Sequence, residues 1–127
     1  MSLSESKVGA TIAVSDMQRA REFYEGKLGL SPGPMNEDAG VVYICGEGTS
    51  LLVYHSPQHA GKATATVATW EVEDAEATVD ELTAKGVAFE QYEEPETDEK
   101  GINSFGDNKI AWFKDPEGNV IAVGQFG

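Results

Sequence analysis

The chain has 127 residues, of which 9 are lysine or arginine and 22 are aspartate or glutamate, so its formal net charge is −13. This length suits one domain with its own core, and the acidic charge disfavours nucleic acids and anionic membrane surfaces as partners. Its single cysteine excludes an internal disulfide. The sequence shows no transmembrane run and no secretory signal at its N-terminus, so we expect a cytoplasmic protein.

The first half of the sequence predicts one strand, one helix and three further strands. Residues 11–16 read as an alternating strand that ends at Asp16, a side chain suited to cap a helix. Apolar residues then recur at helical spacing over residues 17–28, and Gly29 is suited to end that helix. Further strands are expected from residue 30 onward, at 41–45 and at 50–54.

The second half repeats this order of elements. A strand at residues 69–74 ends at Asp74, a helix follows over residues 75–85, and Gly86 ends it. Three strands are expected after it, at residues 87–92, 109–113 and 119–125. The pattern βαβββ therefore occurs twice, as module one (about 7–56), a connector (57–63) and module two (about 64–126), within one domain that spans residues 1–127.

Three groups of residues resemble a known family. They are Val14-Ser15-Asp16 with Phe23-Tyr24, Val72-Glu73-Asp74, and the run from Phe113 through Asp115-Pro116-Glu117-Gly118 to Asn119. Together with the repeat, they resemble the vicinal oxygen chelate superfamily, also called the glyoxalase/bleomycin resistance protein/dioxygenase superfamily. The resemblance implies an α+β fold in which two βαβββ modules form a curved, half-open eight-stranded barrel with helices outside and a ligand on the concave face.

The resemblance also implies four metal-ligand positions, on the first and fourth strands of each module. In this sequence the positions fall on Gly9, Leu52, Val67 and Ala122, and none of these side chains can bind a metal. We therefore predict no metal and no other cofactor. The expected function is metal-independent binding of a small molecule, such as the sequestration of an antibiotic.

Side chains alternate between the two faces of a strand, so the same alignment predicts which residues line the concave face. The predicted ligand-binding residues are Thr11, Tyr54, Thr69 and Trp112, with Phe105 at the mouth of the cavity and Tyr43 as a further candidate. Aromatic walls beside small residues and hydroxyls suit a planar or largely apolar molecule, including one with a cationic portion.

Two alternatives stay open at this point. The chain could be a lyase, isomerase or dioxygenase of the same fold that uses a relocated metal or acid/base site, with Glu71 and His55 as catalytic candidates and a divalent metal as cofactor. It could also be a non-catalytic partner subunit. In either case we expect a homodimer, because curved sheets of this type leave edge strands that need covering.

Overall fold

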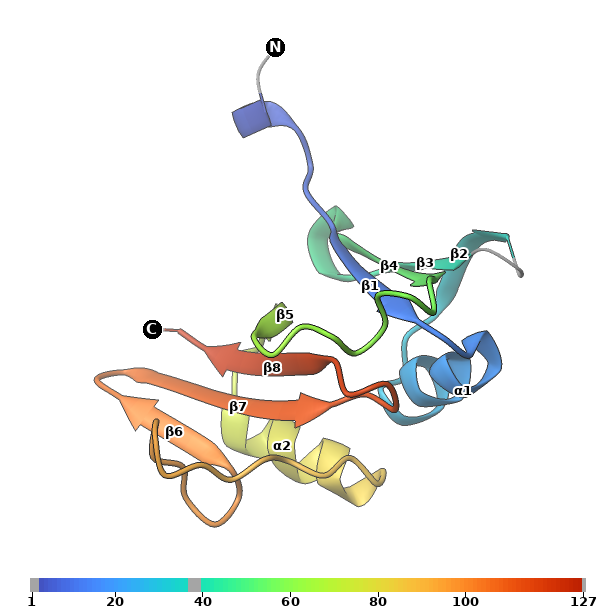
Figure 1. Ribbon diagram of the computed structural model, residues 1–127. Helices are drawn as coiled ribbons and strands as arrows, with labels where there is room; N and C mark the ends of the chain where they lie inside the picture. The colour runs from blue at the N-terminus through green and yellow to red at the C-terminus, as the bar shows by residue number, and fades with distance from the viewer. Residues whose placement is uncertain (1–2, 37–39, 127) are drawn as a thin grey trace.

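The computed structural model describes residues 3–36 and 40–126, and it contains two four-stranded sheets with helical segments packed against them (Figure 1). The first sheet has the order β1-β4-β3-β2 and consists of β1 (Ala10–Val14), β2 (Pro32–Asn36), β3 (Gly40–Ile44) and β4 (Ser50–His55). The second sheet has the order β5-β8-β7-β6 and consists of β5 (Thr66–Glu71), β6 (Ile102–Phe105), β7 (Asn108–Lys114) and β8 (Val120–Gln125).

The two sheets have the same topology. The first strand of each module is parallel to the fourth, and the remaining neighbours are antiparallel. This confirms the α+β fold of two repeated modules. The sheets do not close into a barrel, which is consistent with the half-open arrangement expected from the sequence.

Each helix begins at the predicted aspartate. Oδ1 of Asp16 accepts a hydrogen bond from the backbone N–H of Arg19, and Oδ1 of Asp74 accepts one from Ala77, both at 3.0 Å. The second helix is regular, as α2 (Ala75–Ala84). The first changes from α1 (Met17–Arg21) to a π-helical segment, η2 (Glu22–Lys27), which the spacing did not predict and which buries two consecutive aromatic residues.

None of the helical segments within the described ranges has the length and apolar character needed to cross a membrane. Short 3-10 turns complete the helical content, at η1 (Leu3–Glu5) and η3 (Gly46–Gly48).

The prediction of a strand at residues 87–92 is wrong. Phe89 makes only an isolated bridge to Phe113, and the N–H of Glu90 donates a hydrogen bond to the carbonyl oxygen of Trp112 at 2.8 Å. The strand β6 occupies the edge of β7 instead, and its pairing begins with Ile102 opposite Ala111. A strand joined to its neighbour by a tight turn loses less chain entropy on pairing than one that must close a longer loop.

One end of the junction between the modules is closed by the turn 115–119, which joins β7 to β8. The carboxylate of Asp115 is 5% exposed and accepts a hydrogen bond from the hydroxyl of Tyr24 at 2.6 Å. Asn119, which is 4% exposed, donates to the carbonyl oxygen of Ala13 and to Asp115. These buried bonds connect the last strand of module two to the first strand and helix of module one.

Glu117 completes this closed end. Its carboxylate accepts hydrogen bonds from the hydroxyl of Ser15 at 2.8 Å and from the guanidinium of Arg19 at 3.0 Å. Burial opposes ionisation of Glu117, but the hydrogen bonds from Ser15 and Arg19 outweigh it and hold the pKa of the carboxyl below its usual range. A neutral hydrogen bond from Ser15 and a charged one from Arg19 therefore hold the turn against module one.

Candidate functional site

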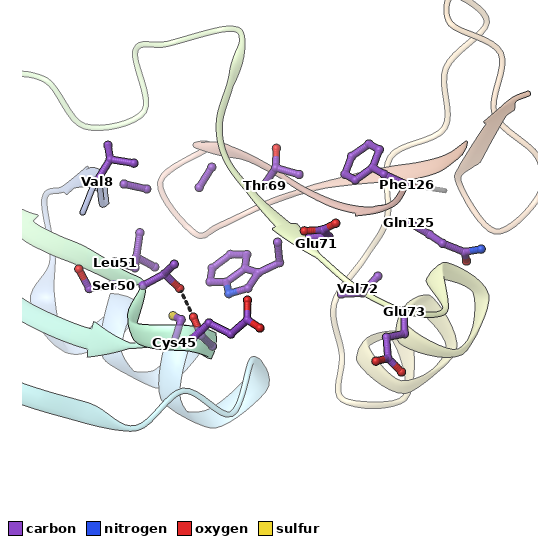
Figure 2. Close-up of a pocket in the computed structure, with 16 residues that line it drawn as sticks. Val8, Cys45, Ser50, Leu51, Thr69, Glu71, Val72, Glu73, Gln125 and Phe126 are labelled. Carbon is purple, nitrogen blue, oxygen red and sulfur yellow. Dashed lines mark hydrogen bonds between the residues drawn. The ribbon is translucent and has the colours of Figure 1, made fainter. Parts of the chain in front are cut away.

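A cavity of about 860 Å³ opens at the other end of the same junction, and we call it the cleft. Figure 2 shows Cys45, Ser50 and Leu51 of module one on one side, and Glu71, Glu73 and Phe126 of module two on the other. The described lining residues are Val8, Ala10, Cys45, Gly46, Glu47, Thr49, Ser50, Leu51, Ala68, Thr69, Trp70, Glu71, Val72, Glu73, Gln125 and Phe126.

The cleft lies along β5, which is one of the two edge strands of the second sheet. Because β5 is hydrogen-bonded only to β8, a cavity at its open edge meets side chains from both of its faces. Thr69 and Glu71 come from the exposed face, whereas Trp70 and Val72 are half-buried and pack against the apolar core. The cleft therefore combines hydroxyl and carboxylate groups with an indole ring.

The charged residues of the lining are all acidic. Among the described residues, the lining includes Glu47, Glu71 and Glu73 and no lysine or arginine. Within the part of the chain that the structure describes, none of these three carboxylates forms an ion pair or hydrogen bond. The ammonium group of Lys7 lies outside the lining, close to the point where a Cβ on Gly48 would stand. A cationic group in the cleft would meet favourable electrostatic potential.

The turn 45–49, which joins β3 to β4, forms one wall of the cleft and shares two backbone features with the turn 115–119. The first N–H of each turn donates to the last carbonyl oxygen, at 2.8 Å from Cys45 to Thr49 and at 3.0 Å from Asp115 to Asn119. Each has a glutamate followed by a glycine with positive φ, 80° at Gly48 and 92° at Gly118. The backbones differ at the glutamate itself, because the φ of Glu47 is 55° and that of Glu117 is not positive.

A smaller cavity of about 210 Å³ lies beside the cleft and shares Trp70 and Val72 with it. It is mainly apolar, and its other lining residues are Leu28, Leu30, Thr78, Glu81, Leu82, Lys85, Phe113 and Val123. The indole of Trp70 thus borders both spaces, between the helix α2 and the module junction.

The structure brings together only some of the residues predicted from the sequence. Thr69 and Glu71 line the cleft, and Thr11, Tyr54, Phe105 and Trp112 do not belong to its described lining. Thr69 and Trp112 are register partners of the same residue, Ala122, so they share one face of the second sheet. Phe105 is 50% exposed at the end of β6. A role of these residues in ligand binding stays a prediction.

The two catalytic candidates lie apart. His55 is the register partner of Val14, at the end of β1 opposite to Ala10, whereas Glu71 shares the cleft with Ala10. A direct acid/base pair of His55 and Glu71 is therefore not formed in this arrangement.

Tyr43 was expected on the concave face and lies on the opposite one. Its ring is fully buried, and its hydroxyl donates to Glu25 of the first helical segment at 2.9 Å. Burial, together with this carboxylate, raises the pKa of Tyr43. The neighbouring residue Val42, which is the register partner of Leu52, takes the position on the concave face, because side chains alternate along β3.

Sequence reasoning missed Trp70, Glu47 and Phe126 as site residues. They were missed because alternation assigns residues to the faces of a sheet, and the cleft lies at an edge. The signal that could have found Glu47 is the shared Glu-Gly pair at 47–48 and 117–118, which marks two turns of equal length.

The four positions implied for metal ligands do not offer a suitable donor set. Leu52 is the partner of Thr11, Ala122 is the partner of Thr69, and Val67 lies at a register shift in β5. Gly9 lies so close to Ser50 that a Cβ would stand 3.0 Å from its hydroxyl oxygen. Within residues 3–36 and 40–126, no three histidine, cysteine, aspartate or glutamate side chains are grouped closely enough to hold an ion.

Comparisons with known proteins agree with this architecture. The sequence model of the Glyoxalase/Bleomycin resistance protein/Dioxygenase superfamily matches residues 8–123. A glyoxalase/bleomycin resistance protein from Catenulispora acidiphila has a similar structure, with 26% identity, a TM-score of 0.72 and coverage of 95% of this chain and 98% of that one.

Two other solved structures show the same fold. An antibiotic-binding protein from Streptomyces sp. CB03234 is 23% identical, with a TM-score of 0.72 and 97% of each chain covered. A lactoylglutathione lyase from Agrobacterium tumefaciens is 20% identical, with a TM-score of 0.66 and coverage of 95% of this chain and 93% of that one. No curated protein sequence matches significantly.

Proposed function

The chain belongs to the Glyoxalase/Bleomycin resistance protein/Dioxygenase superfamily, and within this family we propose that it binds a small molecule without the help of a metal. The ligand is planar or largely apolar and carries a cationic portion. We assign it to the cleft between the modules, where Trp70 provides an aromatic surface and Glu71 a carboxylate. Sequestration of an antibiotic is one activity of this kind.

The observation that carries the proposal is a cavity lined by aromatic and acidic groups in a chain whose family metal positions hold no ligating side chain. Gly9, Leu52, Val67 and Ala122 provide no side-chain donor, while the cleft offers about 860 Å³ beside an indole ring. The similarity to an antibiotic-binding protein supports small-molecule binding, although an enzyme shares the same fold.

Binding and metal dependence can be measured together. The protein is purified without a chelator or an affinity tag, its metal content is determined, and 9-aminoacridine and 2-naphthol are titrated with and without EDTA. We expect saturable quenching of tryptophan fluorescence that EDTA does not change. Stoichiometric iron, manganese, nickel or zinc, or binding that EDTA abolishes, would overturn the proposal in favour of a metal-dependent lyase, isomerase or dioxygenase.

The two tryptophans distinguish the cleft from the concave face, because the chain has no others. Trp70 borders the cleft and Trp112 lies on the face that was predicted from the sequence. We expect Trp70→Phe to remove most of the quenching and to weaken binding, and Trp112→Phe to preserve both. The reverse result would move the site to Thr11, Tyr54, Thr69 and Trp112.

We also propose that the chain forms a homodimer. Ile44, Phe105 and Phe126 are large apolar side chains that are about half exposed, and β2 and β6 are free edges of the two sheets. Size-exclusion chromatography with light scattering would measure the mass, and a monomer at micromolar concentration would contradict the proposal.

A further inference from the structure

We propose that the face of the second sheet at Gly124 is a subsite for an aromatic ring of the ligand, and that the chain's own Phe126 fills this subsite until a ligand displaces it. The inference rests on the proposed function, because it assigns the part of the cleft that holds the ring and the group that competes with the ligand for this place.

The ring of Phe126 lies directly on the backbone of Gly124. A Cβ added to Gly124 would stand 2.7 Å from Cε2 of this ring and closer still to Cζ, separations at which carbon atoms clash. The ring therefore fills the space that a side chain at position 124 would take. Gly124 is buried as a result, whereas Phe126 remains 47% exposed and lines the cleft.

The space under the ring is a groove in the face of the sheet. The register partners of Gly124 are Glu71 on β5 and Ile110 on β7. Because neighbouring strands are about 4.8 Å apart, these two residues are separated by roughly 10 Å, with no side chain from Gly124 between them. A gap of this width accepts one aromatic ring, and Phe126 is a ring of the chain itself that already lies there.

Phe126 can leave the groove without disturbing the sheet. The strand β8 ends at Gln125, whose side-chain oxygen accepts a hydrogen bond from the backbone N–H of Ala75 at 2.9 Å. This bond anchors the end of the strand to α2, and Figure 2 shows the side chains of Gln125 and Phe126 pointing apart. Among the described residues, no other aromatic ring packs against Phe126. Rotation of its own side chain moves the ring into the open cleft.

A ring that is part of the chain competes strongly with a dissolved one, because the tether raises its effective concentration. The apparent affinity of a ligand is then reduced by the fraction of molecules in which the groove is free. Removal of the ring of Phe126 should consequently strengthen the binding of an aromatic ligand. A ring that served only as a wall of the cleft would have the opposite effect, since its removal would delete a contact with the ligand.

The first test compares two variants by calorimetry with 2-naphthol and 9-aminoacridine. We expect Phe126→Ala to bind both probes at least about threefold more tightly, as an occupant present in about two thirds of the molecules would predict. Leu3→Ala removes another exposed apolar side chain, outside the described lining, and should leave the affinities unchanged. Weaker binding by Phe126→Ala would overturn the proposal, and so would a gain that accompanies a change of mass in light scattering.

A variant of the groove itself tests the position. The methyl group of Gly124→Ala excludes Phe126 and the ring of the ligand alike, so we expect it to weaken binding at least about fivefold although it releases Phe126. An affinity gain in Gly124→Ala equal to that in Phe126→Ala would overturn the subsite, because the ligand would then bind elsewhere.

Fluorine NMR measures the displacement directly. The chain is labelled with 4-fluorophenylalanine, and the signal of residue 126 is identified by its absence in Phe126→Ala. Saturation with 2-naphthol should move this signal toward the position of a solvent-exposed ring. A signal that keeps its position at saturation would overturn the displacement.

The remaining outcomes separate this inference from the proposed function. Equal affinities of the unmodified chain and Phe126→Ala would overturn the ring subsite and leave small-molecule binding in place. Absence of binding of both probes by the unmodified chain and by Phe126→Ala would overturn both proposals.

Discussion

The two ends of the module junction carry turns of equal length, and only one of these turns is packed. At one end, the turn 115–119 packs against the first helix through hydrogen bonds of Asp115, Glu117 and Asn119. At the other, the turn 45–49 has the same closing backbone hydrogen bond but a positive φ at Glu47, and it lines a cleft of about 860 Å³. The turns differ in their side chains and in the backbone of the glutamate, so a repeated order of elements does not by itself determine whether a junction is packed or open.

The largest expected effect comes from removing the centre of the closed end. Asp115→Ala leaves the hydroxyl of Tyr24 and the amide of Asn119 without their buried acceptor, so we expect the free energy of unfolding to fall by about 3–5 kcal/mol. Cys45→Ala, at the corresponding position of the open end, should cost less than about 1 kcal/mol. Urea denaturation measures both, and similar losses would contradict the comparison.

A single hydrogen bond at the closed end should have a smaller effect. Tyr24→Phe removes the hydroxyl that donates to Asp115 at 2.6 Å, and we expect a loss of about 1.5–3 kcal/mol, because the acceptor is a buried carboxylate. Tyr54→Phe is the control, since no described residue hydrogen-bonds its hydroxyl. A loss below about 0.5 kcal/mol for Tyr24→Phe would show that water replaces this bond.

The two glutamates should differ in their contribution to stability at acidic pH. The pKa of Glu117 is lowered in the folded state, so its contribution is present above the unfolded-state pKa of about 4.3 and is lost as the pH falls through the folded-state value. Glu117→Gln should therefore cost about 1–2 kcal/mol at pH 7 and flatten the fall in stability between about pH 5 and pH 3. Melting temperatures across this range, with Glu47→Gln as the control, test the difference.

The smallest expected effect is a gain. Glu73→Ser combined with Ala77→Arg gives the open end the two residues that hold Glu117, and Glu47 can then bind them. We expect stability to rise by about 0.5–1 kcal/mol, because the new ion pair is partly exposed. Loss of 9-aminoacridine binding in the same variant would show that the cleft has closed, whereas a stabilised protein that still binds 9-aminoacridine would contradict the comparison of the two ends.

The repeat and the fold could be predicted because they depend on local signals. The caps Asp16 and Asp74 and the alternation of β1 and β8 are set by nearest neighbours, and the family expected from the sequence is confirmed. The strand at 87–92 was wrong because its apolar residues anchor a loop, and the pairing edge of β7 is taken by a hairpin. Competition between two segments for one edge cannot be read from either segment alone.

The site was less accessible to sequence reasoning. The alternation of β5 predicted Thr69 and Glu71 as site candidates, but it predicted no place in the site for Trp70. Its position at the border of two cavities depends on how the modules meet, and on residues of the first module that are distant in sequence. Glu47 likewise could be identified only by comparing its turn with the turn that contains Glu117.

The turn 45–49 has a further consequence for how this protein can change. No described residue bonds the carboxylate of Glu47, but its φ of 55° lies in the left-handed region that β-branched side chains disfavour. The side chains of the turn 115–119 are therefore constrained by their contacts, whereas residue 47 is constrained by its backbone. Glu47→Asn and Glu47→Gly, which suit this conformation, should leave the scaffold intact.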